Sequence, residues 1–302
     1  MLRKTAHDFD QEVLSLFDAY VHGIIDRRVF LEKAAKYAVG GVTAAMLLDQ
    51  LSPNFAATVV AANDDRIKVE SLEFDSPKGY GKGRGYLARP AKEKGKLPAI
   101  LVVHENRGLN PHIEDIARRI AVDGYVAFAP DALFTLGGYP GDEDKARELF
   151  SKLDQAKTRE DFIAAAHLLK ARPETNGKLG AVGFCYGGGM VNFLATQLGG
   201  DLGAGVAFYG SAPELADVPK IKAPLLIQSA ETDERINASW PDYEKALKAA
   251  NVKYERFLYP GTQHGFNNDT TPRYDASAAK LAWERTMTFF AEHLKAGTHK
   301  KA

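Results

Sequence analysis

The chain has very little cysteine, no excess of charge of either sign and no long uninterrupted apolar run. Among its 302 residues there is one cysteine, so no internal disulfide can form and no metal site can be built from several thiolates. Lysine and arginine together number 39, and so do aspartate and glutamate, which gives a formal net charge of zero. This balance argues against nucleic acid or an anionic membrane as the partner and favours a small molecule.

The hydrophobic content is typical of a globular protein with a sizeable core. Apolar residues make up 45% of the chain and charged residues 26%. The apolar run at residues 34–48 is interrupted by Lys36 and Thr43, and it is too short and too polar for a stable membrane span. The single cysteine is a core residue, a surface thiol or a nucleophile, and its neighbours must decide between these interpretations.

Residues 1–62 differ in pattern from the rest of the chain. Apolar side chains recur at helical spacing over Asp8–Val21, which predicts an amphipathic helix, and Asp26 is a candidate N-cap for a second helix. The string Asp26–Lys33 holds paired arginines and precedes an apolar run and small residues at 60–62, as in a twin-arginine export signal. Two interpretations stay open: export to the periplasm, or a helical extension packed on a cytoplasmic protein.

Residues 63–302 have the pattern of one α/β domain. An alternating strand at 69–74, a glycine-rich turn at 79–85 and a returning strand at 85–90 predict an antiparallel hairpin. Mostly apolar runs predict further strands at 99–104, 125–130, 178–184, 203–209, 224–229 and 254–259. Helices are predicted at 113–123, 142–171 and 276–294. Strands that alternate with helices predict a mostly parallel, doubly wound sheet with helices on both faces.

The one cysteine lies in a glycine-rich string between a predicted strand and a predicted helix. The string is Gly183-Phe184-Cys185-Tyr186-Gly187-Gly188-Gly189, which has the G-x-S-x-G pattern of a nucleophile elbow with cysteine in place of serine. The glycines keep strand and helix clear of the strained turn, and the helix N-terminus favours the thiolate. We predict that Cys185 is a nucleophile; the other interpretation is a buried cysteine at an ordinary strand–helix turn.

Two later strands each precede a candidate partner for the cysteine. Asp233 follows the next-to-last predicted strand, and His264 follows the last one in a glycine-flanked turn. Nucleophile, acid and histidine in this chain order fit an α/β-hydrolase fold. We predict that His264 is the base and that Asp233 orients its ring, with Glu231 and Glu234 as rival acids.

With these motifs the chain resembles the dienelactone hydrolase (carboxymethylenebutenolidase) family of the α/β-hydrolase superfamily. The resemblance rests on the cysteine elbow, the Asp233 turn, His264-Gly265-Phe266 and the string His104-Glu105-Asn106-Arg107-Gly108-Leu109-Asn110. It covers roughly residues 67–294 and leaves the N-terminal segment outside.

The resemblance implies roles for residues that follow an early strand. Glu105 is expected beside the cysteine, where it takes part in activating the thiol; the alternative is a carboxylate paired with Arg107. The backbone N–H groups of Asn106 and Tyr186 are expected to form the oxyanion hole.

One departure from the family pattern bears on the substrate. Family members that cleave dienelactones hold the substrate carboxylate with arginines, one of them a few residues after the histidine, where this chain has Asn267-Asn268. Arg273 lies further on, and we interpret it as a surface charge. Without bidentate arginine recognition a carboxylate substrate should bind less well.

The side chains predicted to bind substrate are Arg107, Arg147 and Phe266. Lys145 and Arg159 are alternatives to Arg147, because the helix that holds them cannot be aligned with the family on sequence alone. No metal or organic cofactor is expected, since the neighbouring histidines and acids near residues 104 and 112 lack the spacing of metal ligands on one face.

The sequence therefore predicts a carboxylic ester or lactone hydrolase that passes through an acyl-thioester and acts on a small molecule. A thioesterase or peptidase on the same scaffold is one alternative. A non-catalytic binding protein of the same fold is another, because fold does not fix function. The sequence indicates no particular oligomeric state.

Overall fold

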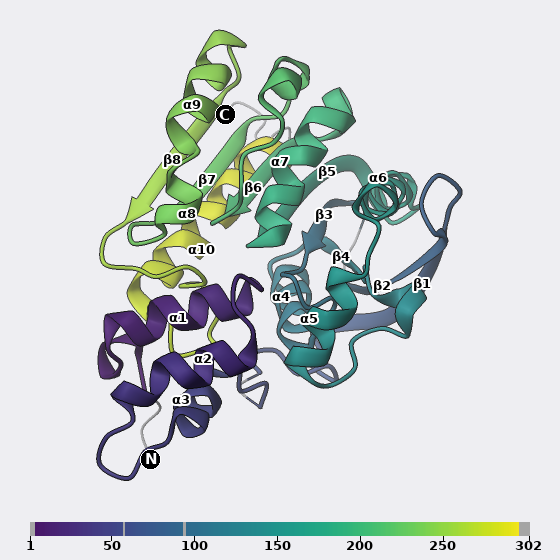
Figure 1. The fold of residues 1–302 in the computed structure, drawn as a ribbon. Coiled ribbons are helices and arrows are strands. Elements are labelled where there is room, and N and C mark those ends of the chain that lie inside the picture. Colours follow the sequence, from purple (N-terminus) through teal and green to yellow (C-terminus); the bar gives the residue numbers. More distant parts are fainter. Residues whose placement is uncertain (1–3, 57, 93–94, 296–302) are drawn as a thin grey trace.

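The computed structural model describes residues 4–56, 58–92 and 95–295. Within them, eight strands form one sheet in the order β1-β2-β4-β3-β5-β6-β7-β8 (Figure 1). β2 pairs antiparallel with both β1 and β4, and the other neighbours are parallel. The strands are β1 (Ile67–Ser76), β2 (Gly81–Pro90), β3 (Leu97–Val103), β4 (Val126–Pro130), β5 (Thr175–Phe184), β6 (Ala204–Phe208), β7 (Leu225–Ala230) and β8 (Tyr254–Tyr259). The predicted mostly parallel sheet is confirmed.

Helices cover both faces of the sheet, as predicted. One face is covered by α4 (Pro111–Val122) and α10 (Ala276–Phe290), and the other by α6 (Gln155–Ala171), α7 (Tyr186–Leu198) and α9 (Trp240–Ala249). Each face has its own apolar core, because successive side chains of a strand point to opposite sides. In β3, Leu101 and Val103 belong to one core, whereas Ile100 and Val102 belong to the other.

The first hairpin of the domain differs from the sequence prediction. Its turn is confined to residues 77–80, so most of the glycines predicted to form a turn lie inside β2. Close packing explains them. A Cβ atom on Gly83 would lie 2.2 Å from the ring of Phe74, and one on Gly85 would lie 2.5 Å from the carbonyl oxygen of Ala129.

The helical stretch predicted at 142–171 is two helices. α5 (Glu143–Ser151) ends before Asp154, whose carboxylate accepts hydrogen bonds from the N–H groups of Ala156 and Lys157 and so caps α6. An aspartate at this position satisfies N–H groups that lack partners in the first helical turn, which favours the start of a new helix.

The N-terminal segment folds into helices that lie at the carboxyl edge of the sheet (Figure 1). These are α1 (Gln11–Val21), α2 (Arg27–Ala34) and α3 (Ala44–Leu51). The predicted N-cap is confirmed, since Asp26 accepts a hydrogen bond from the N–H of Val29 at 2.8 Å. Phe17, Phe30 and Leu51 are buried in an apolar cluster that belongs to this segment alone. The arrangement is that of a packed helical extension.

A hydrogen bond connects the N-terminal segment to the rest of the chain. The N–H of Asn54 donates to the carbonyl oxygen of Thr270 at 2.7 Å, which connects the segment to the sheet domain.

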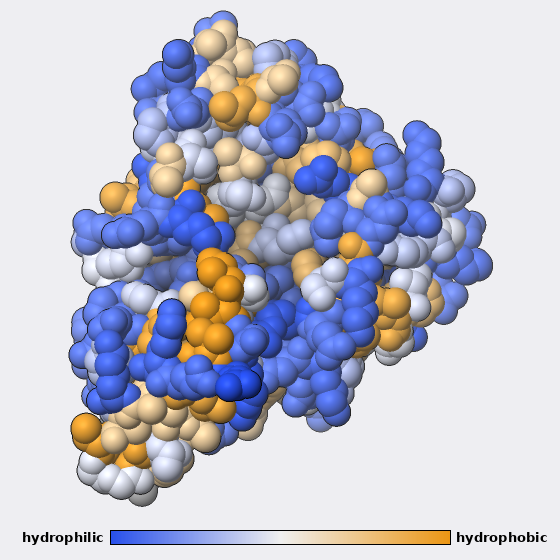
Figure 2. Space-filling model, viewed as in Figure 1, coloured by the Kyte–Doolittle hydropathy of each residue, from blue (hydrophilic) through white to orange (hydrophobic). Residues whose placement is uncertain are grey.

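Apolar side chains are also found on the surface of this segment. Ile24 and Val39 are exposed, and Figure 2 shows apolar residues gathered over α1 and α2. In the described part of the chain, no helix combines the length and the apolar character needed to cross a membrane.

Candidate active site

Cys185 sits at the sharp turn between β5 and α7. Its backbone has φ 56° and ψ −114°, and a non-glycine residue adopts such a positive φ only under constraint. Close approach of the strand and the helix supplies the constraint. A Cβ atom on Gly183 would lie 2.0 Å from the carbonyl oxygen of Gly187, and one on Gly187 would lie 2.2 Å from that of Val103. The flanking glycines are therefore required by the turn, as in a nucleophile elbow.

Asp233 and His264 come together after the ends of β7 and β8. Oδ2 of Asp233 lies 2.5 Å from Nδ1 of His264, and both side chains are buried. The rival acids lie elsewhere: Glu231 is exposed and accepts a hydrogen bond from the N–H of Gly261, and Glu234 is exposed as well. The structure thus pairs the histidine with the predicted aspartate.

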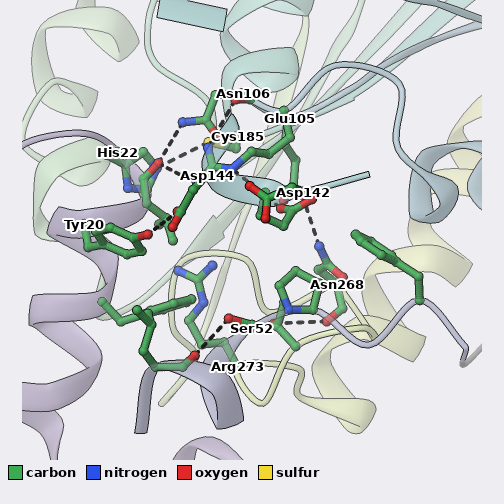
Figure 3. Close-up of a pocket in the computed structure, with 18 of the residues that line it drawn as sticks. Tyr20, His22, Ser52, Glu105, Asn106, Asp142, Asp144, Cys185, Asn268 and Arg273 are labelled. Carbon is green, nitrogen blue, oxygen red and sulfur yellow. Dashed lines mark hydrogen bonds and ion pairs between the residues drawn. The ribbon is translucent and has the colours of Figure 1, made fainter. Parts of the chain in front are cut away.

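The sulfur of Cys185 faces two histidines rather than one. Nε2 of His22 lies 3.4 Å from Sγ (Figure 3), and a ring nitrogen of His264 lies within 4.8 Å of both atoms. The centroids of the two imidazole rings are 4.7 Å apart, and their planes are nearly perpendicular, at 86°.

The charges around the sulfur favour its ionised form. Burial alone would raise the pKa of Cys185, but the positive charges of His264 and His22 outweigh burial and lower the pKa to about 6. Burial alone would lower the pKa of His264, yet the thiolate and the carboxylate of Asp233 raise it to about 10. The pKa of His22 is also raised, because the thiolate and Asp18 outweigh burial. The site favours a thiolate with imidazolium partners.

His22 was not among the residues predicted from the sequence. It directly follows α1, and its Nδ1 lies 2.8 Å from the carbonyl oxygen of Asp18 and 3.3 Å from Oδ1 of that residue. Residues 1–62 lie outside the range that the family resemblance covers, so no site residue was predicted among them. The sequence signal is limited to a histidine four residues after an acid near a helix end, a spacing common on exposed helices.

A cavity of about 320 Å³ opens at Cys185 (Figure 3), and this size suits a small ligand. The N-terminal segment contributes Phe17, Tyr20, Val21, His22, Arg27, Leu48, Ser52, Pro53 and Phe55 to its lining. The sheet domain contributes Glu105, Asn106, Arg107, Tyr139, Gly141, Asp142, Glu143, Asp144, Cys185, His264, Asn268, Thr271 and Arg273. The N-terminal segment is therefore part of the candidate site.

Glu105 shares the cavity with Cys185, as the family resemblance implied. Its Oε2 accepts a hydrogen bond from the side-chain amide of Asn268 at 3.1 Å. The alternative pairing with Arg107 is not the one observed, because the guanidinium of Arg107 forms its ion pair with Glu143, at 3.5 Å.

Asn106 and Tyr186, whose N–H groups are the predicted oxyanion hole, lie on the two segments that border the cysteine. Asn106 lines the cavity after β3, and its side-chain amide donates to the carbonyl oxygen of Val21 at 2.9 Å. Tyr186 is the first residue of α7. Its N–H therefore has no partner within the helix and points out of the helix N-terminus.

Arg107 and Arg147 bind the end of α1. Nη2 of Arg107 donates to the carbonyl oxygen of Val21 at 3.1 Å, and Nη1 of Arg147 donates to that of Tyr20 at 2.6 Å. The last carbonyl groups of a helix lack partners and carry partial negative charge, which attracts guanidinium groups. Arg107 still lines the cavity, whereas Arg147 stacks on the Tyr20 ring outside the lining. The structure thus makes Arg147 a contact of the N-terminal segment rather than of the cavity.

Two other side chains lie in positions that differ from their sequence predictions. Phe266, predicted to contact substrate, is fully buried in the aromatic core, because Gly265 with φ 83° turns the chain inward after His264. Arg273, interpreted as a surface charge, is only 9% exposed. It lines the cavity and pairs with Asp18 at 3.3 Å.

One group of side chains in the described ranges has the geometry to hold a metal ion, namely His22, Cys185 and His264. Nitrogen and sulfur ligands of this kind suit Zn²⁺. The group includes the predicted nucleophile, so a metal and a substrate would compete for the same atoms. His104, by contrast, is structural: its ring is buried, and its Nε2 accepts a hydrogen bond from the N–H of Ala132 at 3.2 Å.

Two protein families match separate parts of the chain, one in the N-terminal segment and one in the sheet domain. Residues 84–294 match the dienelactone hydrolase family, and this range includes Cys185, Asp233 and His264. Residues 1–37 match a separate family described as YqhI-like, and this range includes His22.

Individual proteins and solved structures agree with the larger match. A "Putative carboxymethylenebutenolidase" of Escherichia coli K12 is 33% identical over 254 residues, which cover 79% of this chain and 92% of that protein. A "Putative hydrolase fragment YghX" of the same strain is 56% identical over 114 residues, which cover 37% of this chain and 97% of that protein. The crystal structure of a "Putative Dienelactone Hydrolase" from Klebsiella pneumoniae has a TM-score of 0.66 at 31% identity and covers 74% of this chain and 99% of that one. The chain belongs to the dienelactone hydrolase family of α/β hydrolases and is a hydrolytic enzyme.

Proposed function

We propose that this hydrolase cleaves carboxylic esters or lactones, with Cys185 as the nucleophile, His264 as the base and Asp233 as the residue that orients His264. The observation that carries the proposal is the constrained cysteine turn beside a buried Asp233–His264 pair, with 2.5 Å between Oδ2 and Nδ1. The thiolate is the reactive form of cysteine, and a neighbouring imidazolium favours it.

The proposed reaction has two halves. In the first, the thiolate of Cys185 attacks the carbonyl carbon, and the N–H groups of Asn106 and Tyr186 hold the oxyanion. The bond to the leaving group then breaks, and the acyl group stays on sulfur as a thioester. In the second half, an imidazole removes a proton from water, which attacks the thioester and releases the acid and the thiolate. Glu105, in the same cavity, helps to form the thiolate.

The charges in the cavity favour a neutral ester over a substrate that carries a carboxylate. Each arginine that lines the cavity already has a carboxylate partner in the chain. These pairs are Arg107 with Glu143 at 3.5 Å, Arg273 with Asp18 at 3.3 Å and Arg27 with Asp144 at 3.3 Å. A substrate carboxylate would have to break one of these pairs before it gained bidentate recognition.

The test is hydrolysis of p-nitrophenyl acetate and of a dienelactone by the wild type, Cys185→Ala and His264→Ala. We expect the wild type to turn over the neutral ester faster, and both variants to lose about 10³-fold or more, because the residues act as a unit. Full activity in Cys185→Ala would rule out the nucleophile assignment. A wild type inactive on both compounds would contradict ester and lactone hydrolysis and favour a thioesterase or peptidase on the same scaffold.

A further inference from the structure

His22 is anchored in the site in the same way as His264. Nδ1 of His264 faces the carboxylate of Asp233, and Nδ1 of His22 faces both the carbonyl oxygen and the carboxylate of Asp18. The side chain of His22 is 12% exposed, and its Nε2 lies 3.4 Å from Sγ of Cys185. Two aspartate–histidine pairs, one from each end of the chain, converge on one sulfur atom.

The partners of His22 determine which of its nitrogens exchanges a proton. The carbonyl oxygen of Asp18 can only accept a hydrogen bond, so Nδ1 of His22 carries a hydrogen. Nε2 is then the nitrogen that gains and loses a proton, and it is the one that faces the sulfur. Nη2 of Arg235 lies 3.0 Å from Nε2 and donates to it when Nε2 is unprotonated. Arg235 is exposed, so its side chain can turn to solvent when Nε2 is protonated.

When the nucleophile is a cysteine, the oxygen of an alcohol leaving group must be protonated as it departs. In the tetrahedral intermediate, sulfur leaves more readily than an alkoxide, because thiols are much more acidic than alkyl alcohols. Unless the departing oxygen is protonated, the intermediate returns to the ester. An imidazolium next to the sulfur can supply that proton.

We propose that His22 is a second catalytic histidine, which gives its Nε2 proton to the leaving oxygen of esters and lactones of alkyl alcohols. The inference rests on the ester hydrolysis proposed above and adds a substrate class, namely compounds whose alcohol is a poor leaving group. It also gives the N-terminal segment a chemical role, because this segment supplies the proton donor.

The protons and electrons balance over the cycle. Sγ of Cys185 bonds to the carbonyl carbon, the bond from carbon to the leaving oxygen breaks, and that oxygen takes the Nε2 proton of His22. The products are an alcohol, a thioester and a neutral imidazole. His22 and His264 then share one proton, and the neutral ring accepts a proton from the attacking water. The electron pair of the broken carbon–sulfur bond restores the thiolate.

Several charged groups surround His22, and its protonation depends on all of them. The thiolate of Cys185 and the carboxylate of Asp18 stabilise the imidazolium form of His22. The positive charges of His264, Arg235 and Arg273 oppose the imidazolium form of His22. The charged groups that surround His22 are therefore Asp18, Cys185, His264, Arg235 and Arg273.

The first test compares esters whose leaving groups differ in acidity. We expect His22→Gln to slow hydrolysis of ethyl acetate by about 10²-fold, because general acid catalysis contributes that much, while p-nitrophenyl acetate loses less than about tenfold. The p-nitrophenolate ion leaves without a proton. His7→Gln, the same change at an exposed histidine of the same segment, should match the wild type. Equal losses on both esters in His22→Gln would overturn the proposal.

The second test does not depend on turnover. Cys185 is the only cysteine, so the pH dependence of iodoacetamide alkylation reports its ionisation directly. We expect the midpoint in His22→Gln to lie at higher pH than in the wild type and in His7→Gln, because one imidazolium beside the thiolate is gone. An unchanged midpoint would overturn the placement of a protonated His22 beside the sulfur.

The two tests separate this inference from the proposed function. If the wild type hydrolyses both esters, Cys185→Ala does not, and His22→Gln shows the wild-type dependence on leaving group, only the role of His22 fails. If the wild type hydrolyses no ester, the proposed function fails and the role of His22 as proton donor fails with it.

Discussion

His22 and His264 stand beside one sulfur atom, with ring centroids 4.7 Å apart and planes at 86°. His264 belongs to the range that matches the dienelactone hydrolase family, and His22 belongs to the N-terminal range that matches a different family. The cavity in front of Cys185 is lined by both ranges. Residues from both parts of the chain thus form the candidate active site.

The aspartate that holds His264 gives the first prediction. Asp233→Asn should lower kcat/KM for p-nitrophenyl acetate by about 10³-fold or more, because the amide cannot stabilise the imidazolium. Asp233 also caps the short helix α8 (Glu234–Asn237) by accepting from the N–H of Ile236, and asparagine can do the same. Glu231→Gln is the matched control and should retain wild-type kinetics. Loss of activity in Glu231→Gln with little loss in Asp233→Asn would reverse the assignment of the acid.

The sheet and the cysteine turn were predictable because each depends on local sequence. The Asp233–His264 pair was predictable because each residue follows one of two strands, and the carboxyl ends of parallel strands meet at one edge of the sheet. Apolar runs form buried strands, and the glycines around Cys185 are required where β5 meets α7. The glycines of β2 were misleading because their contacts depend on strand pairing: Gly83 is packed against Phe74 across the hairpin, and Gly85 is packed against Ala129 of β4. The same pattern can make a turn or a closely packed strand, and only the fold decides between them.

The contributions of the N-terminal segment were not predictable for the same reason. Nothing local connects His22 to Cys185, and the burial of Arg273 depends on its pairing with Asp18. The paired arginines that suggested an export signal are in contact with other side chains: Arg27 pairs with Asp144, and Arg28 pairs with Glu32 one turn along α2. Export through a twin-arginine-type signal stays a prediction.

The glycines of the cysteine turn give a prediction about stability. Gly187→Ala should lower the free energy of unfolding by about 1–3 kcal/mol or more, because its Cβ atom would lie 2.2 Å from the carbonyl oxygen of Val103. Gly200→Ala is the control, since a Cβ atom there meets nothing within 4 Å, and the change should stay within about 0.5 kcal/mol. Urea unfolding measures both. Equal stability of the two variants would contradict the close approach of β3 and α7.

The pKa shifts give a prediction about pH. The pKa of Cys185 is lowered to about 6, so the thiolate is present above that pH. The pKa of His264 is raised to about 10, so its imidazolium is present below that pH. We therefore expect kcat/KM for p-nitrophenyl acetate to rise through about pH 6, and kcat/KM for ethyl acetate, whose leaving group needs a proton, to rise there and to fall again towards pH 10, as macroscopic values of the coupled groups. A profile that rises only near the ordinary thiol pKa of 9.0 would contradict the stabilised thiolate.

The two histidines and the cysteine also predict sensitivity to zinc. His22, Cys185 and His264 offer ligand atoms within 4.8 Å of one another, and each histidine is held through Nδ1 by an aspartate, as in many zinc sites. Zn²⁺ should inhibit ester hydrolysis, and EDTA should restore it. Removal of a residue that hydrogen-bonds a zinc ligand lowers zinc affinity by about 10–100-fold. His22→Gln removes a ligand itself, so it should weaken zinc inhibition by at least that factor. Equal inhibition of His22→Gln and His7→Gln would place the zinc elsewhere.

Nucleophilic catalysis by Cys185 requires that its sulfur carries the acyl group during turnover. The most direct measurement is rapid quenching of the wild type with p-nitrophenyl acetate, followed by mass spectrometry of the intact protein and of its peptides. We predict one acetyl group on the peptide that contains Cys185, formed as fast as the initial release of p-nitrophenolate, and none in Cys185→Ala. Acetylation of another residue, or steady release of p-nitrophenolate by Cys185→Ala at the wild-type rate, would contradict it.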